Sequence, residues 1–499
     1  MVGWPPLDFA GTRSRDEAAR RWEQLIRDEQ PFMNDGPDIG GSGAPGLGHR
    51  RAAGEDAEHT PWSGQNLGRE VALQPGRRWT ETPLVVIPGS KSLTNRALLI
   101  AALARGRSAI GGILRSDDSY WCVNALETMG VAVAINGTTA TVDGVNGQWP
   151  LSTGRIYVGS AGTVARFIPP SLCIAADREW RIDASEQMRR RPMAPLFSAL
   201  TQLGARISFL GAPNHLPVLL SSTGLAGGEL SVPGSRSSQF LSGVLIASPY
   251  ARTPVTITVP DSIVQASYVR MTLSTMARFG VSATSSDSLR QISVPQGHYV
   301  ARDITLEPDV STAGYFMALA AVTGQRLRLP GVSEKTDQPD IGLLQILKRM
   351  GCHVASDAAG IEIEGPDTLA GGFTADMHEM SDQALTLAAM AVFADAPISI
   401  TGVEHIRAHE SDRIRAICEN LSLLGIETQE KRDGLMVRPG PVTAARLDPH
   451  DDHRVAMSLS VIGARAPGIR IINPACVSKT FPEFYSRLKT LGVGVSFVP

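Results

Sequence analysis

The feature that most constrains the fold is an internal repeat with a period of about seventy residues. In each repeat an apolar residue and a glycine end an amphipathic stretch, and an alternating, strand-like stretch follows. The glycines of this signature are Gly130, Gly204, Gly280, Gly351, Gly425 and Gly492, spaced 74, 76, 71, 74 and 67 residues apart. Glycine is favoured directly after a helix, where the backbone turns left-handed. The chain from about Leu84 onward is therefore predicted to contain six similar units.

Each unit also contains an earlier helix that is mostly apolar. The stretch 97–103, ALLIAAL, is apolar on nearly all sides, which predicts a helix buried among sheets. Helical and strand-like periods alternate in each unit, so the fold class is α/β. Six such helices predict two three-helix bundles inside walls of sheet.

The starts of these apolar helices are polar or basic. Helix N-termini expose unpaired N–H groups and a partial positive charge, so several that converge form an anion site. We therefore expect anionic substrates. The residues at these starts are Lys91, Ser92, Asn95 and Arg96; Ser160, Gly162 and Thr163; Ser237, Ser238 and Gln239; Ser311 and Thr312; Asp382 and Gln383; and Asp452, His453 and Arg454.

Composition excludes several classes of protein. The chain has 499 residues with 47 Lys+Arg against 49 Asp+Glu, so no global positive field favours nucleic acid. No apolar run reaches the length of a membrane span, and the first residues lack a secretory pattern, which predicts a cytoplasmic protein. Five scattered cysteines predict reduced, buried thiols and neither disulfides nor a zinc site.

The first eighty residues differ from the rest. Ser14 and Glu17 form a capping-box pattern, which predicts a short amphipathic helix over 15–29. The stretch 34–68 contains nine Gly and three Pro, which favours a linker. We expect residues 1–80 to be a poorly ordered extension, and residues 1–75 to be dispensable for chemistry.

Six motifs in this order resemble those of the 5-enolpyruvylshikimate-3-phosphate synthase family. They are PGSKSLTNRALLIAALA at 88–104, SEQMRRRPMAPL at 185–196, VPGSRSSQFLSG at 232–243, HESDR at 409–413, DDHRVAM at 451–457 and KTFPEFY at 479–485. The resemblance implies two similar domains, each of three βαβαββ units around buried helices, the inverted α/β prism of enolpyruvyl transferases. One domain would span 89–307, and the other 81–88 with 308–499.

The resemblance also implies a reaction. The 5-hydroxyl of shikimate 3-phosphate would add to C2 of phosphoenolpyruvate, and the tetrahedral intermediate would lose phosphate, as in chorismate and aromatic amino acid biosynthesis. No cofactor, metal, membrane or nucleic acid is implied, and we expect a monomer.

The site residues follow from the same motifs. The catalytic candidates are Lys91, Asp382, Glu410 and Lys479. The candidates for phosphoenolpyruvate are Lys91, Gly162, Arg191, Gln239, Arg413, Arg454 and Lys479. The candidates for shikimate 3-phosphate are Ser92, Arg96, Ser237, Ser238, Gln239, Gln265, Asp382, His405 and His409. Arginine forks suit phosphate and carboxylate groups, and paired carboxylates suit proton transfer.

Gln265 and Ser160 depart from the most familiar pattern, which has Ser and Asn there. Together with the N-terminal extension, they leave open an enolpyruvyl transferase with another phosphorylated acceptor, such as a nucleotide. A non-catalytic paralogue that binds metabolites is a separate alternative, and the presence of Lys91, Asp382, Glu410 and Lys479 argues against it. Three further expectations concern charge. The two sets of helix ends should repel until anions bridge them. Cleft cations should repel one another, so Lys91→Ala and Arg413→Ala should keep the fold. A protonated His409 should help hold the acceptor's phosphate.

Overall fold

The computed structural model describes residues 60–63 and 68–498, and all structural statements refer to them. The helix predicted over 15–29 and most of the glycine-rich stretch lie outside the described residues. The described chain forms six small sheets of three or four strands, interleaved with helices, which confirms the α/β class and the sixfold repeat.

The first three units hold the elements between 91 and 305. They are α2 (Lys91–Leu103), β2 (Arg105–Gly111), α3 (Asp117–Thr128), β3 (Val133–Asn136) and β4 (Thr139–Val145); β5 (Thr153–Tyr157), α4 (Gly162–Leu172), β6 (Ala176–Asp183), α5 (Glu186–Arg189), α6 (Ala194–Gln202), β7 (Ala205–Phe209) and β8 (Val218–Thr223); β9 (Gly228–Ser231), α7 (Ser238–Ala247), η2 (Ser248–Tyr250), β10 (Val255–Thr258), α8 (Ala266–Arg278), β11 (Thr284–Ser285), β12 (Gln291–Val294) and β13 (Ile304–Thr305).

The last three units hold the elements from 310 onward. They are α9 (Val310–Thr323), β14 (Arg326–Pro330), η3 (Pro339–Gly342), α10 (Leu343–Arg349), β15 (His353–Asp357) and β16 (Gly360–Glu364); β17 (Phe373–Asp376), η4 (Ser381–Gln383), α11 (Ala384–Ala391), β18 (Ile398–Thr401), η5 (Glu404–Ala408), α12 (Arg413–Leu423), β19 (Thr428–Lys431) and β20 (Gly434–Val437); β21 (Ala445–Leu447), α13 (His453–Gly463), β22 (Ile469–Ile472), η6 (Pro474–Lys479), α14 (Phe484–Thr490) and β23 (Gly494–Val498).

The six signature glycines end the amphipathic helices as predicted. Each follows the C-cap residue of its helix, and each has a φ between 79° and 94°. That backbone conformation is costly for residues with a Cβ, so glycine is required at the turn into the following strand.

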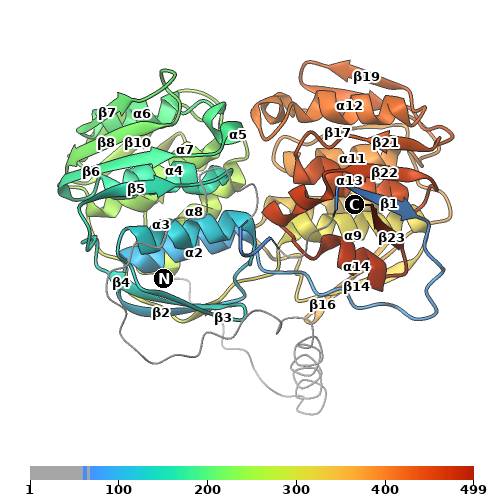
Figure 1. The fold of residues 1–499 in the computed structure, drawn as a ribbon, viewed down its shortest axis with the longest axis horizontal. Helices are drawn as coiled ribbons and strands as arrows, with labels where there is room; N and C mark the ends of the chain where they lie inside the picture. The colour runs from blue at the N-terminus through green and yellow to red at the C-terminus, as the bar shows by residue number, and fades with distance from the viewer. Residues whose placement is uncertain (1–59, 64–67, 499) are drawn as a thin grey trace, which may run out of the picture. The chain divides into compact units, whose positions relative to one another are not determined.

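The apolar helices are buried, as the sequence indicates. Every residue of α9 except its last, Thr323, is buried. Two separate hydrophobic cores form, one from residues between 93 and 306 and one from 71–87 with 310–493. The labels α9, α11 and α13 in Figure 1 mark the three buried helices of the second core. These cores agree with the proposed domain boundaries, which remain a proposal.

The extension predicted over 1–80 needs a correction, because it contains the strand β1 (Glu70–Gln74). This strand pairs antiparallel with β22 on one side and with β23 on the other. In Figure 1 the blue arrow of β1 lies among these red strands. It takes the central place that β8 has in the second unit, where β6 and β7 flank it. A truncation before Thr80 would therefore remove a central strand and leave its partners' backbone groups unpaired.

The chain passes between the two cores at two places, between Ile87 and Leu93 and between Leu306 and Val310. Leu84 forms a parallel bridge with Arg328, and β13 pairs in parallel with β2. The crossings lie side by side at Gly89 and Pro308, where Ser90 N–H donates to the Glu307 carbonyl over 3.0 Å. The chain thus passes between the cores immediately before α2 and α9 begin, and this places helix N-termini at the junction.

Candidate active site

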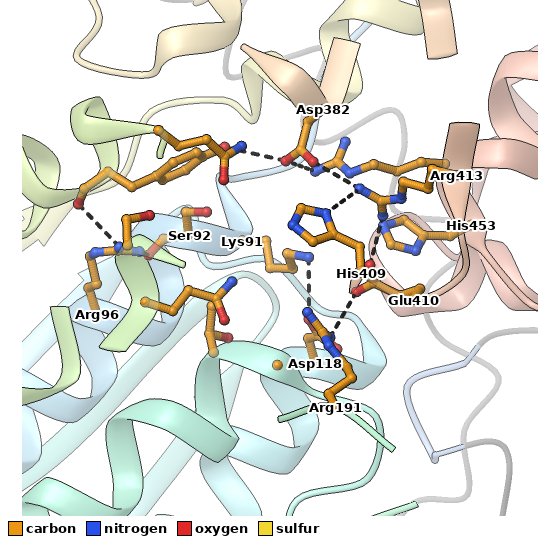
Figure 2. A pocket seen from close by; sticks show the side chains of 17 residues that line it. Lys91, Ser92, Arg96, Asp118, Arg191, Asp382, His409, Glu410, Arg413 and His453 are labelled. Atoms are coloured by element: carbon orange, nitrogen blue, oxygen red, sulfur yellow. Dashed lines mark hydrogen bonds and ion pairs between the residues drawn. The ribbon is translucent and has the colours of Figure 1, made fainter. Parts of the chain in front are cut away.

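One pocket collects the N-terminal ends of the buried helices from both cores (Figure 2). Its first wall belongs to the first core and consists of Lys91, Ser92, Arg96, Asp118, Gly162, Thr163, Arg191, Ser238, Gln239, Gln265 and Tyr268. Its second wall belongs to the second core and consists of Asp382, His409, Glu410, Arg413, His453 and Arg454. Both walls come from a single chain.

Arg413 is the centre of an ionic network on the second wall. Its Nε donates to Asp452 Oδ2 over 2.8 Å, and its Nη2 donates to Glu410 Oε2 over 2.8 Å. Its Nη1 donates to Asp382 Oδ1 over 3.1 Å. The side chain is only 2% exposed, and Asp452 is fully buried. The three carboxylates balance the positive charge of this buried guanidinium. Burial alone would lower the pKa of Arg413, but the negative charges of its partners raise it by more.

Glu410 joins the two walls. Its Oε1 lies 3.3 Å from Lys479 Nζ and 3.4 Å from Nη1 of Arg191, which belongs to the first wall. Burial would raise the pKa of this carboxyl, but the positive charges of Lys479, Arg413 and Arg191 hold it well below its usual value. Glu410 is therefore ionised, although its side chain is only 9% exposed.

Asp382 is the second carboxylate of the site, and its side chain is 13% exposed. Arg454 Nη2 donates to its Oδ2 over 2.8 Å, and Tyr268 from the first wall lies 3.5 Å from the same oxygen. Burial raises the pKa of Asp382, while Arg454 and Arg413 lower it by more and hold it at about 2. The two carboxylates share Arg413 but differ in their other cations, and each can take part in proton transfer.

Arg96 on the first wall has a different environment. Its Nε donates to Thr272 Oγ1 over 2.8 Å, and its Nη2 lies 3.2 Å from Ser242 Oγ. Its side chain also lies over the ring of Phe167 at 5.0 Å. No carboxylate of the described chain pairs with it, and burial lowers its pKa to about 10. A buried cation with neutral neighbours is suited to bind an anion that enters the pocket.

A family model for EPSP synthase (3-phosphoshikimate 1-carboxyvinyltransferase) matches residues 82–488. The chain belongs to the EPSP synthase family. A 3-phosphoshikimate 1-carboxyvinyltransferase 2 of Halalkalibacterium halodurans is 47% identical over 89% of this chain and 99% of its own length. The relative in Nostoc, 3-phosphoshikimate 1-carboxyvinyltransferase, is 41% identical over 81% of this chain and 95% of its own length. A solved EPSP synthase from Acinetobacter baumannii superposes with a TM-score of 0.73 at 26% identity, over 86% of this chain and all of its own.

The pocket of this EPSP synthase family member contains every residue that the motifs assigned to catalysis or substrate binding, except three. Of the other residues named at the helix starts, the lining includes Thr163 and His453 but not Asn95, Ser160, Ser311, Thr312, Gln383 and Asp452. Lys479 lies beside the lining, and its Nζ donates to the Ser160 carbonyl over 2.8 Å in addition to pairing with Glu410. Ser237 caps α7, where its hydroxyl accepts from Gln239 N–H. His405 lies behind the lining in η5. The roles of all these residues remain proposals.

Four lining residues were not among the candidates. Thr163 and His453 were named at helix starts without an assigned role, but Asp118 and Tyr268 were missed. Asp118 pairs with Lys91 Nζ at 3.3 Å. The doubled aspartate that starts α3 was an available signal, because the same polar start marks the other lining helices. Tyr268 lies three residues after Gln265, so one turn of α8 brings both to the pocket.

The expected repulsion between cleft cations is wrong for Arg413. The sequence shows the arginines but does not show that Asp382, Glu410 and Asp452 contact this one. Removal of its guanidinium would leave three buried carboxylates with fewer cations, so Arg413→Ala should not keep the stability of the fold. The ion pair between Arg191 and Glu410 likewise shows attraction between the two walls.

The contacts of His409 favour a neutral ring over the protonated form expected beside a phosphate. Arg413 Nη1 lies 3.0 Å from His409 Nδ1, and this geometry requires the ring nitrogen to accept. Burial and then the charge of Arg413 lower the pKa of His409 well below its usual value. His409 is therefore neutral at the pocket.

Gln265 has a structural role that Ser could not fill in the same way. Its Nε2 donates to Ser381 Oγ over 3.0 Å, and Ser381 Oγ lies 2.8 Å from His405 Nε2. The Ser381 hydroxyl can therefore donate to a neutral His405, whose pKa burial and then His378 lower to about 4. This chain of hydrogen bonds joins the first wall to the second.

Within residues 60–63 and 68–498, no cluster of three or more His, Cys, Asp and Glu side chains is arranged to hold a metal ion. In the same ranges, no helix combines the length and the hydropathy that a bilayer crossing requires.

Proposed function

We propose that this chain transfers the enolpyruvyl group of phosphoenolpyruvate to the 5-hydroxyl of shikimate 3-phosphate and releases phosphate. The observation that carries the proposal is the pair of largely buried, ionised carboxylates, Glu410 and Asp382, each held by cations within one pocket of an EPSP synthase fold. Both substrates are anions, and the pocket supplies cations from both walls for them.

The contacts support phosphoenolpyruvate at the junction of the two walls. Lys91, Arg191, Arg413 and Lys479 surround Glu410 or its neighbour Asp118 there. A Cβ on Gly162 would lie 2.9 Å from Arg191 Nη1, so glycine leaves room for this guanidinium. The phosphate and carboxylate of the substrate compete with Glu410 for these cations.

This competition gives Glu410 a proton-transfer role. Its pKa is low because Lys479, Arg413 and Arg191 offset its burial. When substrate anions share those cations, the pKa of Glu410 rises toward the range in which a carboxyl exchanges protons. Glu410 then exchanges a proton with the methylene carbon. It gives the proton when the acceptor hydroxyl adds, and it takes one back when phosphate leaves.

Shikimate 3-phosphate is assigned to the first wall. Arg96, Ser92 and Ser238 line it, together with Gln239 and Gln265. Asp382 contacts Tyr268 of this wall, so its carboxylate lies where an acceptor hydroxyl can donate to it. As the hydroxyl oxygen bonds to C2 of phosphoenolpyruvate, Asp382 takes the hydroxyl proton.

A cytoplasmic monomer completes the proposal. All five cysteines are free and buried, which suits a reducing compartment. Both walls of the pocket come from one chain, so the site is complete without a second copy. Size-exclusion chromatography with light scattering would test this, and a stable dimer would contradict it.

Incubation with phosphoenolpyruvate and shikimate 3-phosphate tests the function. We expect phosphate release that depends on both substrates, and a product with the mass of the acceptor plus one enolpyruvyl group. Release with a nucleotide acceptor but not with shikimate 3-phosphate would instead assign another acceptor. Binding of phosphoenolpyruvate without release under any condition would indicate a non-catalytic paralogue.

A further inference from the structure

Asp117 is a buried carboxylate that accepts three hydroxyl groups. Thr60 Oγ1 and Ser63 Oγ each donate to its Oδ1 over 2.6 Å, and Ser478 Oγ donates to its Oδ2. Asp117 is 7% exposed, and Ser478 is 2% exposed. No guanidinium or ammonium contact to this carboxylate is present among the described ion pairs, so hydroxyl groups carry its solvation.

The three donors come from distant parts of the chain. Asp117 begins α3 in the first core, whereas Ser478 lies in η6, whose Val477 is part of the second core. Thr60 and Ser63 belong to the segment that precedes β1. Asp117 therefore connects both cores and the N-terminal segment through one carboxylate.

The segment 60–63 is shaped for this contact. Ser63 N–H donates to the Thr60 carbonyl over 3.0 Å, and Thr60 N–H donates to Ser63 Oγ over 2.6 Å, so both hydroxyls point the same way. Trp62 packs edge-on against Tyr120 at 5.8 Å, and Arg115 lies 5.4 Å from its ring. Both hydroxyl residues are 9% exposed. The segment thus binds α3 through polar and aromatic contacts.

The residues next to this network in sequence either contact a catalytic candidate or are one. Asp118 follows Asp117 and pairs with Lys91 at 3.3 Å. Lys479 follows Ser478 and contacts Glu410. A shift of the Ser478 backbone would move Lys479 with it, because the two are adjacent in one short 3₁₀ helix.

We infer that residues 60–63 form a clasp on Asp117, and that Asp117 is a positioning residue that holds Ser478 and thereby Lys479 in place for reaction. The inference rests on the proposed role of Lys479 in enolpyruvyl transfer. The clasp satisfies one oxygen of Asp117 and leaves the other for Ser478. Without the clasp, Asp117 Oδ1 is buried and has no hydroxyl donor. Either water or the Ser478 hydroxyl must then hydrogen-bond to it, and we expect η6 to shift as a result.

The test is the double variant Thr60→Val/Ser63→Ala in the full chain. Both changes keep the approximate size of the side chain and remove only the clasp hydroxyls. Because displacement of a catalytic group by about 1 Å can cost on the order of 10²-fold, we expect kcat to fall by roughly ten- to a hundredfold. The KM for shikimate 3-phosphate should change little, because Arg96 and Ser238 belong to the first wall.

Two controls separate positioning from general damage. Thr60→Ser/Ser63→Thr keeps both hydroxyls and should restore kcat to near the unmodified value. Thr253→Val/Ser286→Ala makes the same chemical changes at exposed residues of the third unit and should leave kcat unchanged. Normal kcat in the clasp variant, or equal losses in the clasp and control variants, would overturn the inference.

Hydrogen exchange tests the clasp independently of turnover. In the Thr60→Val/Ser63→Ala variant, the amides of η6 should exchange faster, while those of β23 stay protected. If the unmodified chain fails to release phosphate, the proposed function is wrong, and this exchange result still decides whether the clasp holds η6. Unchanged exchange in η6 would reject the clasp.

Discussion

Arg96 and Arg413 are two buried arginines that line the same pocket from opposite walls, yet their partners differ in kind. Arg96 contacts hydroxyls, two backbone carbonyls and aromatic rings, whereas Arg413 contacts three carboxylates. Burial lowers the pKa of Arg96 to about 10, while the pKa of Arg413 is raised by carboxylates that outweigh its burial. One wall thus holds an uncompensated charge, and the other holds a compensated network.

This difference separates two tasks. An uncompensated cation gains the most when an anion enters, so Arg96 favours binding. The charge of Arg413 is already balanced by carboxylates, so it attracts an entering anion less strongly. It keeps Glu410 and Asp382 ionised and in place, so its main contribution is expected to be to the rate of the reaction. The first wall is therefore expected to set the affinity for the acceptor, and the second wall to set the rate.

The largest expected effect is on turnover. Glu410→Gln removes a proton-transfer group and should lower kcat by about 10²–10⁴-fold. The KM for phosphoenolpyruvate should stay the same or fall, because the glutamine no longer competes for Lys479 and Arg191. Steady-state kinetics with each substrate varied would measure both constants.

Arg96→Met is the matched change on the first wall. Loss of a charged hydrogen-bond donor worth about 1.5–3 kcal/mol should raise the KM for shikimate 3-phosphate by roughly ten- to a hundredfold. The value of kcat at saturation should fall far less than in Glu410→Gln. Equal losses of kcat in the two variants would remove the distinction between the walls.

Stability should show the opposite ranking of the two arginines. Arg413→Met leaves Asp452, Asp382 and Glu410 buried with fewer cations, which should cost about 3–5 kcal/mol. Arg96→Met strands no carboxylate and removes a charge that burial disfavours, so its cost should stay within about 1 kcal/mol. Thermal or urea unfolding of both variants measures this, and similar melting temperatures would contradict the comparison.

Acid unfolding should depend on the second wall. The pKa of Asp382 is held at about 2, below its ordinary value of 3.8. A lowered carboxyl pKa stabilises the fold above the unfolded-state value, and the gain is lost as the pH falls through the folded-state value. Asp382 should thus contribute about 2–3 kcal/mol at neutral pH, and this contribution should disappear between about pH 4 and about pH 2.

The variant Asp382→Asn checks this window. Its unfolding free energy should lie below that of the unmodified chain at neutral pH and converge with it in acid. Asp287→Asn changes an exposed aspartate and serves as the control. A constant difference between the Asp382→Asn and unmodified curves from neutral to acid pH would show that the carboxylate charge is not the cause.

Local sequence signals were sufficient for much of the fold. The six glycines report a backbone conformation that few other residues tolerate, so each predicted helix end was found. The apolar stretch of α9 reports burial on all sides. The strand β1 was missed because it follows a glycine-rich stretch, and its partners β22 and β23 are about four hundred residues away in sequence.

The site was predicted as a set of residues, but its electrostatics were not. Motifs identified Arg413 and Glu410, whereas the sequence could not show that one carboxylate contacts Arg413, Lys479 and Arg191 together. The clasp on Asp117 was missed for the same reason, because hydroxyl residues such as Thr60 carry no pattern that names their partner. Pairing across distant segments depends on the tertiary fold.

The smallest expected effect concerns His409, where the walls meet. The sequence suggested that a protonated His409 compensates for Gln265, so the affinity for the acceptor would weaken as the pH rises through neutrality. In the structure Arg413 donates to His409 Nδ1, and burial and that charge lower the pKa of His409 well below its usual value. His409 should therefore lose its proton at a pH well below neutrality. The phosphate of the acceptor has its own pKa at about 6, so between about pH 7 and about pH 8.5 the dissociation constant of shikimate 3-phosphate should not change with pH. His409→Gln should shift the constant without giving it a slope. Calorimetric titrations across this range measure the dissociation constant at each pH. If the constant changes with pH in the unmodified chain and His409→Gln abolishes that change, His409 is a cation in the complex, and the second wall supplies the charge that compensates the acceptor's phosphate.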